Sequence, residues 1–288
     1  MSFSVGIVGL PNVGKSTLFK ALTKQQVDIS NYPFCTIDPH VGVVAVPDER
    51  LEKIARIIKP EKITPTIIEF IDIAGLVKNA HQGEGLGNQF LSHIYAVDAI
   101  LLITRCFEDE KIVHVEKQID PQRDFEIILN ELKLKDEQLA QKPSVNVCNV
   151  KDEGKNKEFD KCDLKMDIKL EVERLDLSPK EQKELSLPCS QLDKLITACY
   201  EKLDLITFYT IKGGQETRAW TLEKNSKASQ AGGLVHTDFQ EKFIRAEVIN
   251  WQKLVEAGSW SKTRDQGLLR TEGKEYLVQD GDVIEFKI

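Results

Sequence analysis

Gly9-Leu10-Pro11-Asn12-Val13-Gly14-Lys15-Ser16 has the spacing of a phosphate-binding loop (P-loop), between an apolar run, Phe3 to Val8, and a helix-like stretch, Thr17 to Leu22. Glycines let backbone N–H groups curl around phosphate oxygens, and the following helix presents its positive dipole end to the anion. The loop therefore predicts a bound nucleotide, with Lys15 at the β- and γ-phosphates and Ser16 on Mg²⁺. An ordinary glycine-rich turn is the weaker alternative. The residues expected to bind the phosphates are Gly9, Asn12, Val13, Gly14, Lys15, Ser16 and Thr17.

Composition is that of a globular protein without a membrane span. Of the 288 residues, 41% are hydrophobic and 30% charged, and no apolar run approaches the ~20 residues that a membrane helix needs. The chain passes directly from Met1 into the first expected strand, which predicts a cytoplasmic protein without a secretory signal. A net charge of −7 gives no global attraction to nucleic acid, so neither DNA nor a membrane is an expected partner. The six cysteines lack close paired spacings, which predicts reduced thiols.

Short apolar runs alternate with helix-periodic stretches over residues 1–203, the first predicted domain. This alternation predicts an α/β fold with a mostly parallel sheet covered on both faces, and ligands beyond the carboxyl ends of its strands. The expected strands are Val41 to Val46, Thr66 to Ile71, Asp98 to Ile103 and Ser144 to Cys148, and the expected helices include Glu49 to Ile58 and Leu86 to Val97. The highly charged stretch from Lys151 to Glu184 is interpreted as solvated helix and linker rather than as a functional patch.

Short strands and glycine turns replace this pattern after Asp204. They predict a separate small β-rich domain over residues 204–288. Its expected strands are Ile206 to Ile211, Thr217 to Leu222, Ala246 to Ile249, Glu275 to Val278 and Asp282 to Phe286.

Asp72-Ile73-Ala74-Gly75 follows an expected strand and has the D-x-x-G form of a Walker B aspartate. Asp72 would hold Mg²⁺ through water, and the Gly75 N–H would meet the γ-phosphate. A further Mg²⁺ ligand should come from a loop between the first helix and the second strand, where Thr36 supplies a hydroxyl group. An ordinary loop threonine is the alternative interpretation of Thr36.

The residue that orients the attacking water is not the usual one. Ras-like enzymes carry a glutamine after the D-x-x-G glycine, and here that position is Leu76. Leucine cannot orient water, so either hydrolysis is slow or another group takes over. His114 is the candidate, although a lone histidine is more often structural or simply exposed.

Taken together, these motifs resemble the Obg-like ATPase family, also called the YchF family. The similarity rests on the P-loop, Asn31 to Ile37, Asp72 to Val77, Gly83 to Asn88, Cys106-Phe107-Glu108 with Ile112 to Val115, His236 to Phe239, Phe243 to Val248 and Val278 to Asp282. The resemblance implies a Ras-like P-loop NTPase domain followed by a small α+β, ubiquitin-like TGS domain. It also implies preference for ATP over GTP, association with the ribosome or its large subunit, His114 as the catalytic substitute, and Asn12 as a K⁺ ligand.

Base specificity depends on Asn149-Val150-Lys151-Asp152, which follows an expected strand. Guanine is usually read by N-K-x-D, whereas the family that this chain resembles has N-x-x-E. This chain keeps Asn149, has Val150 in place of the lysine, and carries Asp152 where the family has glutamate. ATP is the predicted nucleotide, because Val150 removes the lysine that packs over the base. The loop that closes over the base is assigned to Cys162.

Two family features look short in this sequence. The family's helical coiled-coil arm is expected near residues 140–143, where only Gln141-Lys142-Pro143 stand. No apolar strand precedes Cys162, which predicts a sheet without its sixth strand and with an exposed edge. We interpret both gaps as stretches of the protein that this sequence omits. A genuine deletion is the alternative, and it would explain the missing arm more readily than the missing strand.

The leading functional hypothesis is a slow Mg²⁺-dependent ATPase that acts as a nucleotide-dependent switch on the ribosome, in translation or stress regulation. One alternative is a nucleotide-gated protein-binding module with negligible hydrolysis, which Leu76 makes credible. Another is a conventional GTP-binding GTPase, which Asp152 leaves open.

Overall fold

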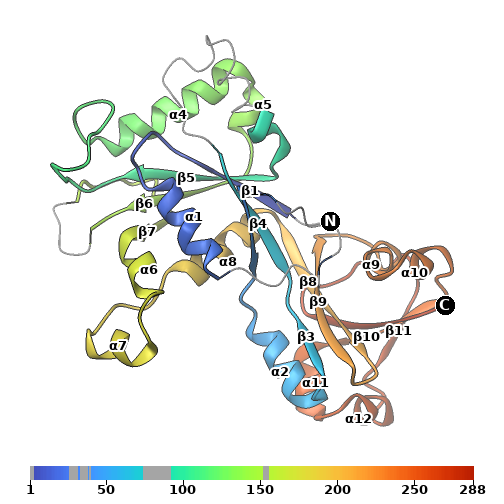
Figure 1. Ribbon diagram of the computed structural model, residues 1–288. Helices are drawn as coiled ribbons and strands as arrows, with labels where there is room; N and C mark the ends of the chain where they lie inside the picture. The colour runs from blue at the N-terminus through green and yellow to red at the C-terminus, as the bar shows by residue number, and fades with distance from the viewer. Residues whose placement is uncertain (1–2, 26–31, 33–37, 39, 74–91, 152–155) are drawn as a thin grey trace. The chain divides into compact units, whose positions relative to one another are not determined.

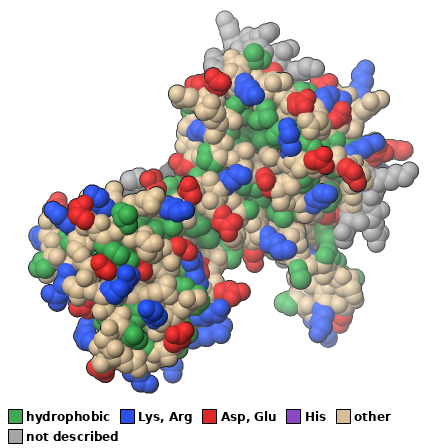
Figure 2. Space-filling view, turned by 180° about the vertical axis from the view of Figure 1, so that it is seen from behind, with side chains coloured by type: hydrophobic (Ala, Val, Ile, Leu, Met, Phe, Trp, Pro, Cys, Tyr) green, Lys and Arg blue, Asp and Glu red, His purple; other side chains and the backbone are tan. Residues whose placement is uncertain are grey.

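The computed structural model describes residues 3–25, 32, 38, 40–73, 92–151 and 156–288 (Figure 1). The chain forms two compact units, which we call the P-loop unit (2–44 and 68–203) and the C-terminal unit (45–67 and 204–288). Among the described residues, no helix combines the length and the apolar character that crossing a membrane requires. Lys and Arg side chains are interspersed with Asp and Glu on the face shown in Figure 2, without a large field of one sign.

The P-loop unit is built on a six-stranded sheet in the order β2-β4-β1-β5-β6-β7. Strand β1 is parallel to β4 and β5, and the parallel pairing continues through β6 to β7. Every residue of β5 is buried, as expected for a central strand covered on both faces. The predicted α/β class is confirmed. The strands are Phe3–Val8 (β1), Val41–Ala45 (β2), Ile67–Asp72 (β4), Ala99–Arg105 (β5), Ser144–Asn149 (β6) and Leu164–Met166 (β7).

In the P-loop unit, helices follow β1, β5 and β7 along the chain. Helix α1 begins at Lys15, within the last two residues of the P-loop motif, and buries Leu18, Ala21 and Leu22. Helix α4 begins after Asp120, whose carboxylate accepts a hydrogen bond from the backbone of Arg123. The helices are Lys15–Thr23 (α1), Pro121–Lys135 (α4), Glu137–Ala140 (α5), Ile168–Arg174 (α6), Pro179–Glu184 (α7) and Leu192–Lys202 (α8).

The sheet has a sixth strand, so the prediction that this strand is missing was wrong. Strand β7 pairs with β6 in parallel, with Val147 opposite Leu164 and Asn149 opposite Met166. The sequence does not predict this strand, because it has only three residues. It also follows Cys162, whereas we expected an apolar run before that cysteine. In the continuously described stretch 92–151, α5 ends at Ala140 and β6 begins at Ser144, and no helical arm stands between them.

A disulfide joins Cys148, in β6, to Cys162, which directly precedes β7. The sequence predicted reduced thiols because it contains no closely spaced pair. The two cysteines are 14 residues apart, but pairing of β6 with β7 brings their Cα atoms to 5.9 Å. The prediction of reduced thiols failed for this pair because the spacing of cysteines along the chain does not show which strands pair with each other.

The C-terminal unit has its own six-stranded sheet, in the order β11-β10-β12-β8-β9-β3. Strands β8 and β9 form a hairpin through Gly213 and Gly214, whose φ angles of 48° and 82° suit a tight turn. Strand β12 lies parallel to β8, with Val283 opposite Tyr209. The strands are Lys62–Thr64 (β3), Leu205–Lys212 (β8), Glu216–Glu223 (β9), Arg245–Asn250 (β10), Arg270–Glu272 (β11) and Asp282–Lys287 (β12).

Helices cover this second sheet and bury two apolar clusters. One cluster includes Phe208, Val248 and Phe286, and the other includes Tyr209 and Leu254. The expected strand from Glu275 to Val278 is reduced to one isolated bridge, between Lys227 and Leu277. The helices are Glu49–Ile58 (α2), Ala228–Val235 (α9), Thr237–Glu241 (α10), Trp251–Ala257 (α11) and Trp260–Asp265 (α12).

Residues 45–67 belong to the C-terminal unit, whereas the sequence assigned all of 1–203 to the first domain. Helix α2 packs Leu51 and Ile54 into the cluster around Tyr209, and β3 extends the second sheet by pairing with β9. The Tyr209 hydroxyl also donates to Asp48, the N-cap of α2. The periodicity of α2 correctly predicted a helix over 49–58 but carries no information about which sheet it covers.

Candidate nucleotide-binding site

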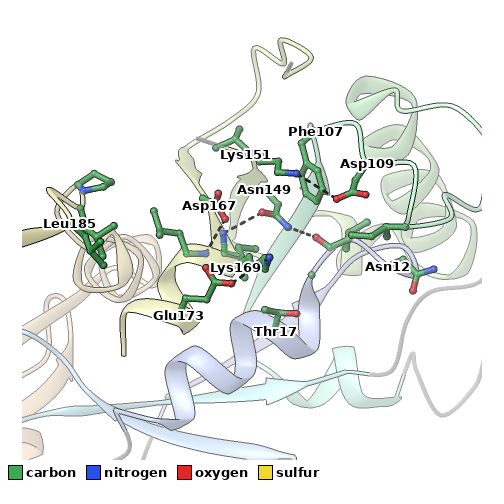
Figure 3. A pocket seen from close by; sticks show the side chains of 18 of the residues that line it. Asn12, Thr17, Phe107, Asp109, Asn149, Lys151, Asp167, Lys169, Glu173 and Leu185 are labelled. Carbon is green, nitrogen blue, oxygen red and sulfur yellow. Dashed lines mark hydrogen bonds and ion pairs between the residues drawn. The ribbon is translucent and has the colours of Figure 1, made fainter. Parts of the chain in front are cut away.

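A cavity of about 660 Å³ lies at the carboxyl ends of the strands in the P-loop unit (Figure 3). Its position is the one expected for a ligand in a parallel sheet. Its volume suits a small organic ligand. The lining comes from Asn12, Val13, Gly14 and Thr17, from Phe107, Asp109 and Ile112, from Asn149 to Lys151, from Asp167 to Leu170 with Glu173, and from Leu185 to Pro188.

The P-loop is packed too closely against the sheet for larger residues at its glycines. A Cβ atom on Gly9 would lie 2.7 Å from the carbonyl oxygen of Ile103, and one on Gly14 would lie 2.7 Å from Nδ2 of Asn149. Gly14 also has a φ of 112°, which L residues rarely adopt. These contacts explain why the loop needs glycine at both ends, and they fix it to β5 and β6.

Lys15 is buried at the centre of this loop. Its Nζ donates to the carbonyl oxygens of Gly9 and Leu10 at 3.0 and 2.9 Å. Burial lowers the pKa of Lys15, and the charge of Asp72 opposes that effect. The ammonium group is therefore held by weak neutral acceptors, which phosphate oxygens can replace with a large electrostatic gain.

Two of the predicted Mg²⁺ ligands meet in the structure. The Ser16 hydroxyl donates to Oδ2 of Asp72 at 3.2 Å, although the residues are 56 positions apart. A hydroxyl and a carboxylate are oxygen ligands of the kind that Mg²⁺ prefers, so this pair fits the ion. Thr36, Gly75 and Leu76 lie outside the described residues. Within the described part of the chain, no cluster of three or more His, Cys, Asp or Glu side chains is placed to hold a metal.

Asn149 connects three parts of the site and is itself buried. Its Nδ2 donates to the carbonyl oxygen of Val13 at 2.8 Å, and its Oδ1 accepts from the backbone N–H of Ile168 at 3.3 Å. The side chain thus joins the P-loop to β6 and to the start of α6. Val150 lines the pocket, and Asp152 lies outside the described residues.

The structure does not place Cys162 at the pocket, where the sequence predicted the loop that closes over the base. Cys162 stands before β7, at the amino end of that strand, and is not part of the pocket lining. The segment from Asp167 to Leu170 follows β7 at its carboxyl end and does line the pocket. Because the three-residue strand went unrecognised, the loop after it was sought too early in the chain.

His114 is buried beside α4 and lines a neighbouring hollow instead of the nucleotide pocket. Its Nε2 lies 2.9 Å from Oδ2 of Asp124, poorly aligned for a hydrogen bond, while its Nδ1 accepts from the backbone N–H of Glu116 at 3.2 Å. The Asp124 carboxylate is also paired with Arg123 at 2.9 Å. The segment keeps a link to the P-loop, since Nδ2 of Asn12 donates to the carbonyl oxygen of Val113 at 3.1 Å.

Several residues that line the pocket were not among the predicted site residues. Phe107, Asp109 and Ile112 follow β5, so their place at a strand's carboxyl end was a usable signal. The segment from Leu185 to Pro188 comes from a region interpreted as linker, and its sequence contains no recognisable binding motif.

A P-loop between β1 and α1, with Ser16 beside Asp72 and a parallel sheet below, defines this protein as a Ras-like P-loop NTPase. Residues 4–150 match the family described as 50S ribosome-binding GTPase, and residues 205–288 match the YchF-GTPase C-terminal family, described as a protein of unknown function.

Full-length relatives narrow the class. The chain is 38% identical to the ribosome-binding ATPase YchF of Bacillus subtilis, over 100% of this chain and 99% of the relative. It is also 38% identical to Obg-like ATPase 1 of Pongo abelii, over 99% and 92% of the two chains. The solved structure of the Schizosaccharomyces pombe YchF GTPase is 32% identical, covers 99% of this chain and 98% of its own, and has a TM-score of 0.84. The chain belongs to the YchF family of Obg-like ATPases.

This chain is shorter than its relatives in the interior. The comparison with the Bacillus subtilis protein spans 368 positions, while this chain has 288 residues, so the difference, about 80 positions, holds no residue of this chain. This agrees with the direct passage from α5 to β6 where the family's arm was expected.

Proposed function

We propose that this protein binds ATP with Mg²⁺, hydrolyses it slowly, and uses its nucleotide state to control association with the ribosome in the cytoplasm. The observation that carries the proposal is the meeting of Lys15, Ser16 and Asp72 beside a pocket of nucleotide size. The printed names of the relatives, ribosome-binding ATPase and Obg-like ATPase, support both the reaction and the partner.

The phosphates bind at the P-loop in this proposal. Lys15 leaves the carbonyl oxygens of Gly9 and Leu10 and donates to the β- and γ-phosphates, while loop N–H groups hold the remaining oxygens. Ser16 and Asp72 hold Mg²⁺, with Thr36 as a further ligand, and the Gly75 N–H meets the γ-phosphate. When bound, the ion neutralises charge that develops on the transferring phosphoryl group.

His114 is the group proposed to orient the attacking water, because Leu76 cannot. To do so, its imidazole must move away from Asp124, which lies 2.9 Å from Nε2, and from the Glu116 N–H, which donates to Nδ1. The need for this movement is one physical reason to expect slow turnover. A ribosome that favours the displaced position would accelerate hydrolysis.

Adenine is the proposed base, and GTP is expected to bind more weakly. Val150 stands where a guanine-binding motif carries lysine, and it lines the pocket. Asp152 favours the alternative of a conventional GTPase, because a carboxylate can accept hydrogen bonds from guanine. Both hypotheses use the same phosphate site and differ only at the base.

K⁺ is proposed as a second ion beside the phosphates, with Asn12 as its ligand. The nitrogen of that side chain donates to Val113, so the amide oxygen is the atom that would face the cation. Equal turnover in Na⁺ and K⁺ buffers would remove this ion from the proposal.

Turnover with and without purified ribosomes tests the proposed switch. We expect slow ATP hydrolysis by the protein alone and strong stimulation by ribosomes. Tight ATP binding with no hydrolysis under either condition would instead support the nucleotide-gated binding module. Lys15→Ala, measured in parallel, should abolish turnover and exclude a contaminating ATPase.

A further inference from the structure

Arg105 is a fully buried cation at the end of β5, and the functions proposed above do not use it. Its exposed fraction is 1%, which places it among the largest fully buried side chains of the described chain. Burial lowers its pKa, with the charge of Asp109 opposing the effect. Burying a guanidinium group costs free energy unless its donors are hydrogen-bonded. The groups that accept hydrogen bonds from Arg105 therefore show which part of the structure this residue holds in place.

The guanidinium group of Arg105 donates to three main-chain carbonyl oxygens of one loop. Nε donates to Phe107 at 3.0 Å, Nη1 to Ile112 at 3.0 Å and Nη2 to Asp109 at 3.2 Å. The group also lies over the Phe107 ring, 4.7 Å from its centroid. One rigid, planar donor group thus fixes the path of residues 107–112.

Residues 107–114, which we call the 107–114 loop, touch both ends of the nucleotide pocket. Near the P-loop, Asn12 donates to the carbonyl oxygen of Val113 at 3.1 Å. Near β6, Nζ of Lys151 lies 3.6 Å from Oδ2 of Asp109 (Figure 3). The side chains of Phe107, Asp109 and Ile112 form the wall between these two contacts.

We propose that Arg105 is a positioning residue for the nucleotide site. It holds the 107–114 loop in register, so that the pocket wall and the segment carrying His114 are placed together. The inference rests on the proposed function, because it concerns the same ATP site. Arg105 itself touches no nucleotide, and it acts through the backbone of the loop.

Arg105→Lys is the direct test, because lysine keeps the charge but donates from a single atom. It cannot span carbonyl groups at residues 107, 109 and 112 as the arginine fork does. We expect the KM for ATP to rise and kcat per folded site to fall, each by about tenfold, the effect of one lost hydrogen bond to a charged group. Hydrogen exchange should increase within the 107–114 loop.

A purely structural role predicts a different result. Arg105→Lys would then lower the unfolding temperature but leave KM and kcat per folded site within about twofold of the wild type, which overturns the inference. The matched control is Arg50→Lys in the C-terminal unit, where the arginine pairs with Asp48 and Asp280. This control should leave ATP turnover by the protein alone unchanged.

A second variant decides the matter if Arg105→Lys does not fold. Glu110→Gly loosens the loop backbone at an exposed position and leaves every pocket side chain in place. It should raise the KM for ATP and lower kcat in a folded protein, and wild-type kinetics would overturn the inference. If the proposed function itself were wrong, the wild type would neither bind nor hydrolyse ATP. That result distinguishes it from a wrong assignment of Arg105 alone.

Discussion

Asn149→Asp tests how the nucleotide site is held together. The substitution keeps the size and shape of the side chain and replaces its NH₂ donor by an oxygen. That oxygen would face the carbonyl oxygen of Val13, now 2.8 Å from Nδ2, so a hydrogen bond becomes a contact between two acceptors. The bond from the Ile168 N–H to Oδ1 can remain.

The magnitude follows from burial. Asn149 is 6% exposed, so an unsatisfied Val13 carbonyl group costs about 1–3 kcal/mol. Burying the new carboxylate adds a further cost of at least about 1 kcal/mol, for about 2 kcal/mol or more in all. Because each 1.4 kcal/mol is a factor of about ten, nucleotide affinity should fall by roughly 30-fold or more if the cost is expressed in the P-loop.

The cost can appear as weaker nucleotide binding or as a lower free energy of unfolding. Calorimetric titration of ADP measures the first, and denaturant unfolding measures the second. Asn149→Ala is the control, because it removes both hydrogen bonds without introducing a repulsive oxygen. We expect the aspartate variant to be the more impaired, although its shape is closer to asparagine. If Asn149→Asp bound ADP and unfolded as the wild type does, the assigned role of Asn149 as a connector would be refuted.

The remaining predictions concern catalysis, protonation and domain structure. His114→Ala should lower kcat by about a hundredfold or more with little change in ATP affinity, and unchanged turnover would remove the histidine from the mechanism. Burial lowers the pKa of Lys15 and phosphate charge should raise it again, so ATP binding just below the ordinary lysine pKa of about 10.4 should take up a proton; equal apparent binding enthalpies in buffers of different ionisation enthalpy would contradict this. Ile54→Ala should destabilise the C-terminal unit by about 2–4 kcal/mol in denaturant unfolding and leave ATP affinity unchanged, and weakened ATP binding would argue against our domain division.

Features tied to chemistry were predictable from the sequence. The P-loop spacing and the strand before Asp72 correctly brought Ser16 and Asp72 together, because phosphate and Mg²⁺ binding impose fixed residue types at strand ends. The apolar run of β5 was equally clear, since a strand buried on both faces needs nearly continuous hydrophobic sequence.

Features that depend on tertiary partners were not predictable. Strand β7 is too short to give a periodic signal, and without it we expected Cys162 at the pocket, where the structure places Asp167 to Leu170. Helix α2 looked the same whichever sheet it covered, since periodicity identifies the buried face but not what covers it. His114 is buried beside Asp124, and no sequence motif indicates that these two residues are neighbours.

Competitive titration of ATP and GTP at this pocket tests whether the P-loop unit is an ATP site. Non-hydrolysable analogues of both nucleotides, measured with Mg²⁺ against wild type and Lys15→Ala, separate base preference from phosphate binding. We expect the wild type to bind the ATP analogue more tightly than the GTP analogue and the variant to bind neither. Tighter binding of the GTP analogue, or ATP binding that persists without Lys15, would contradict this expectation.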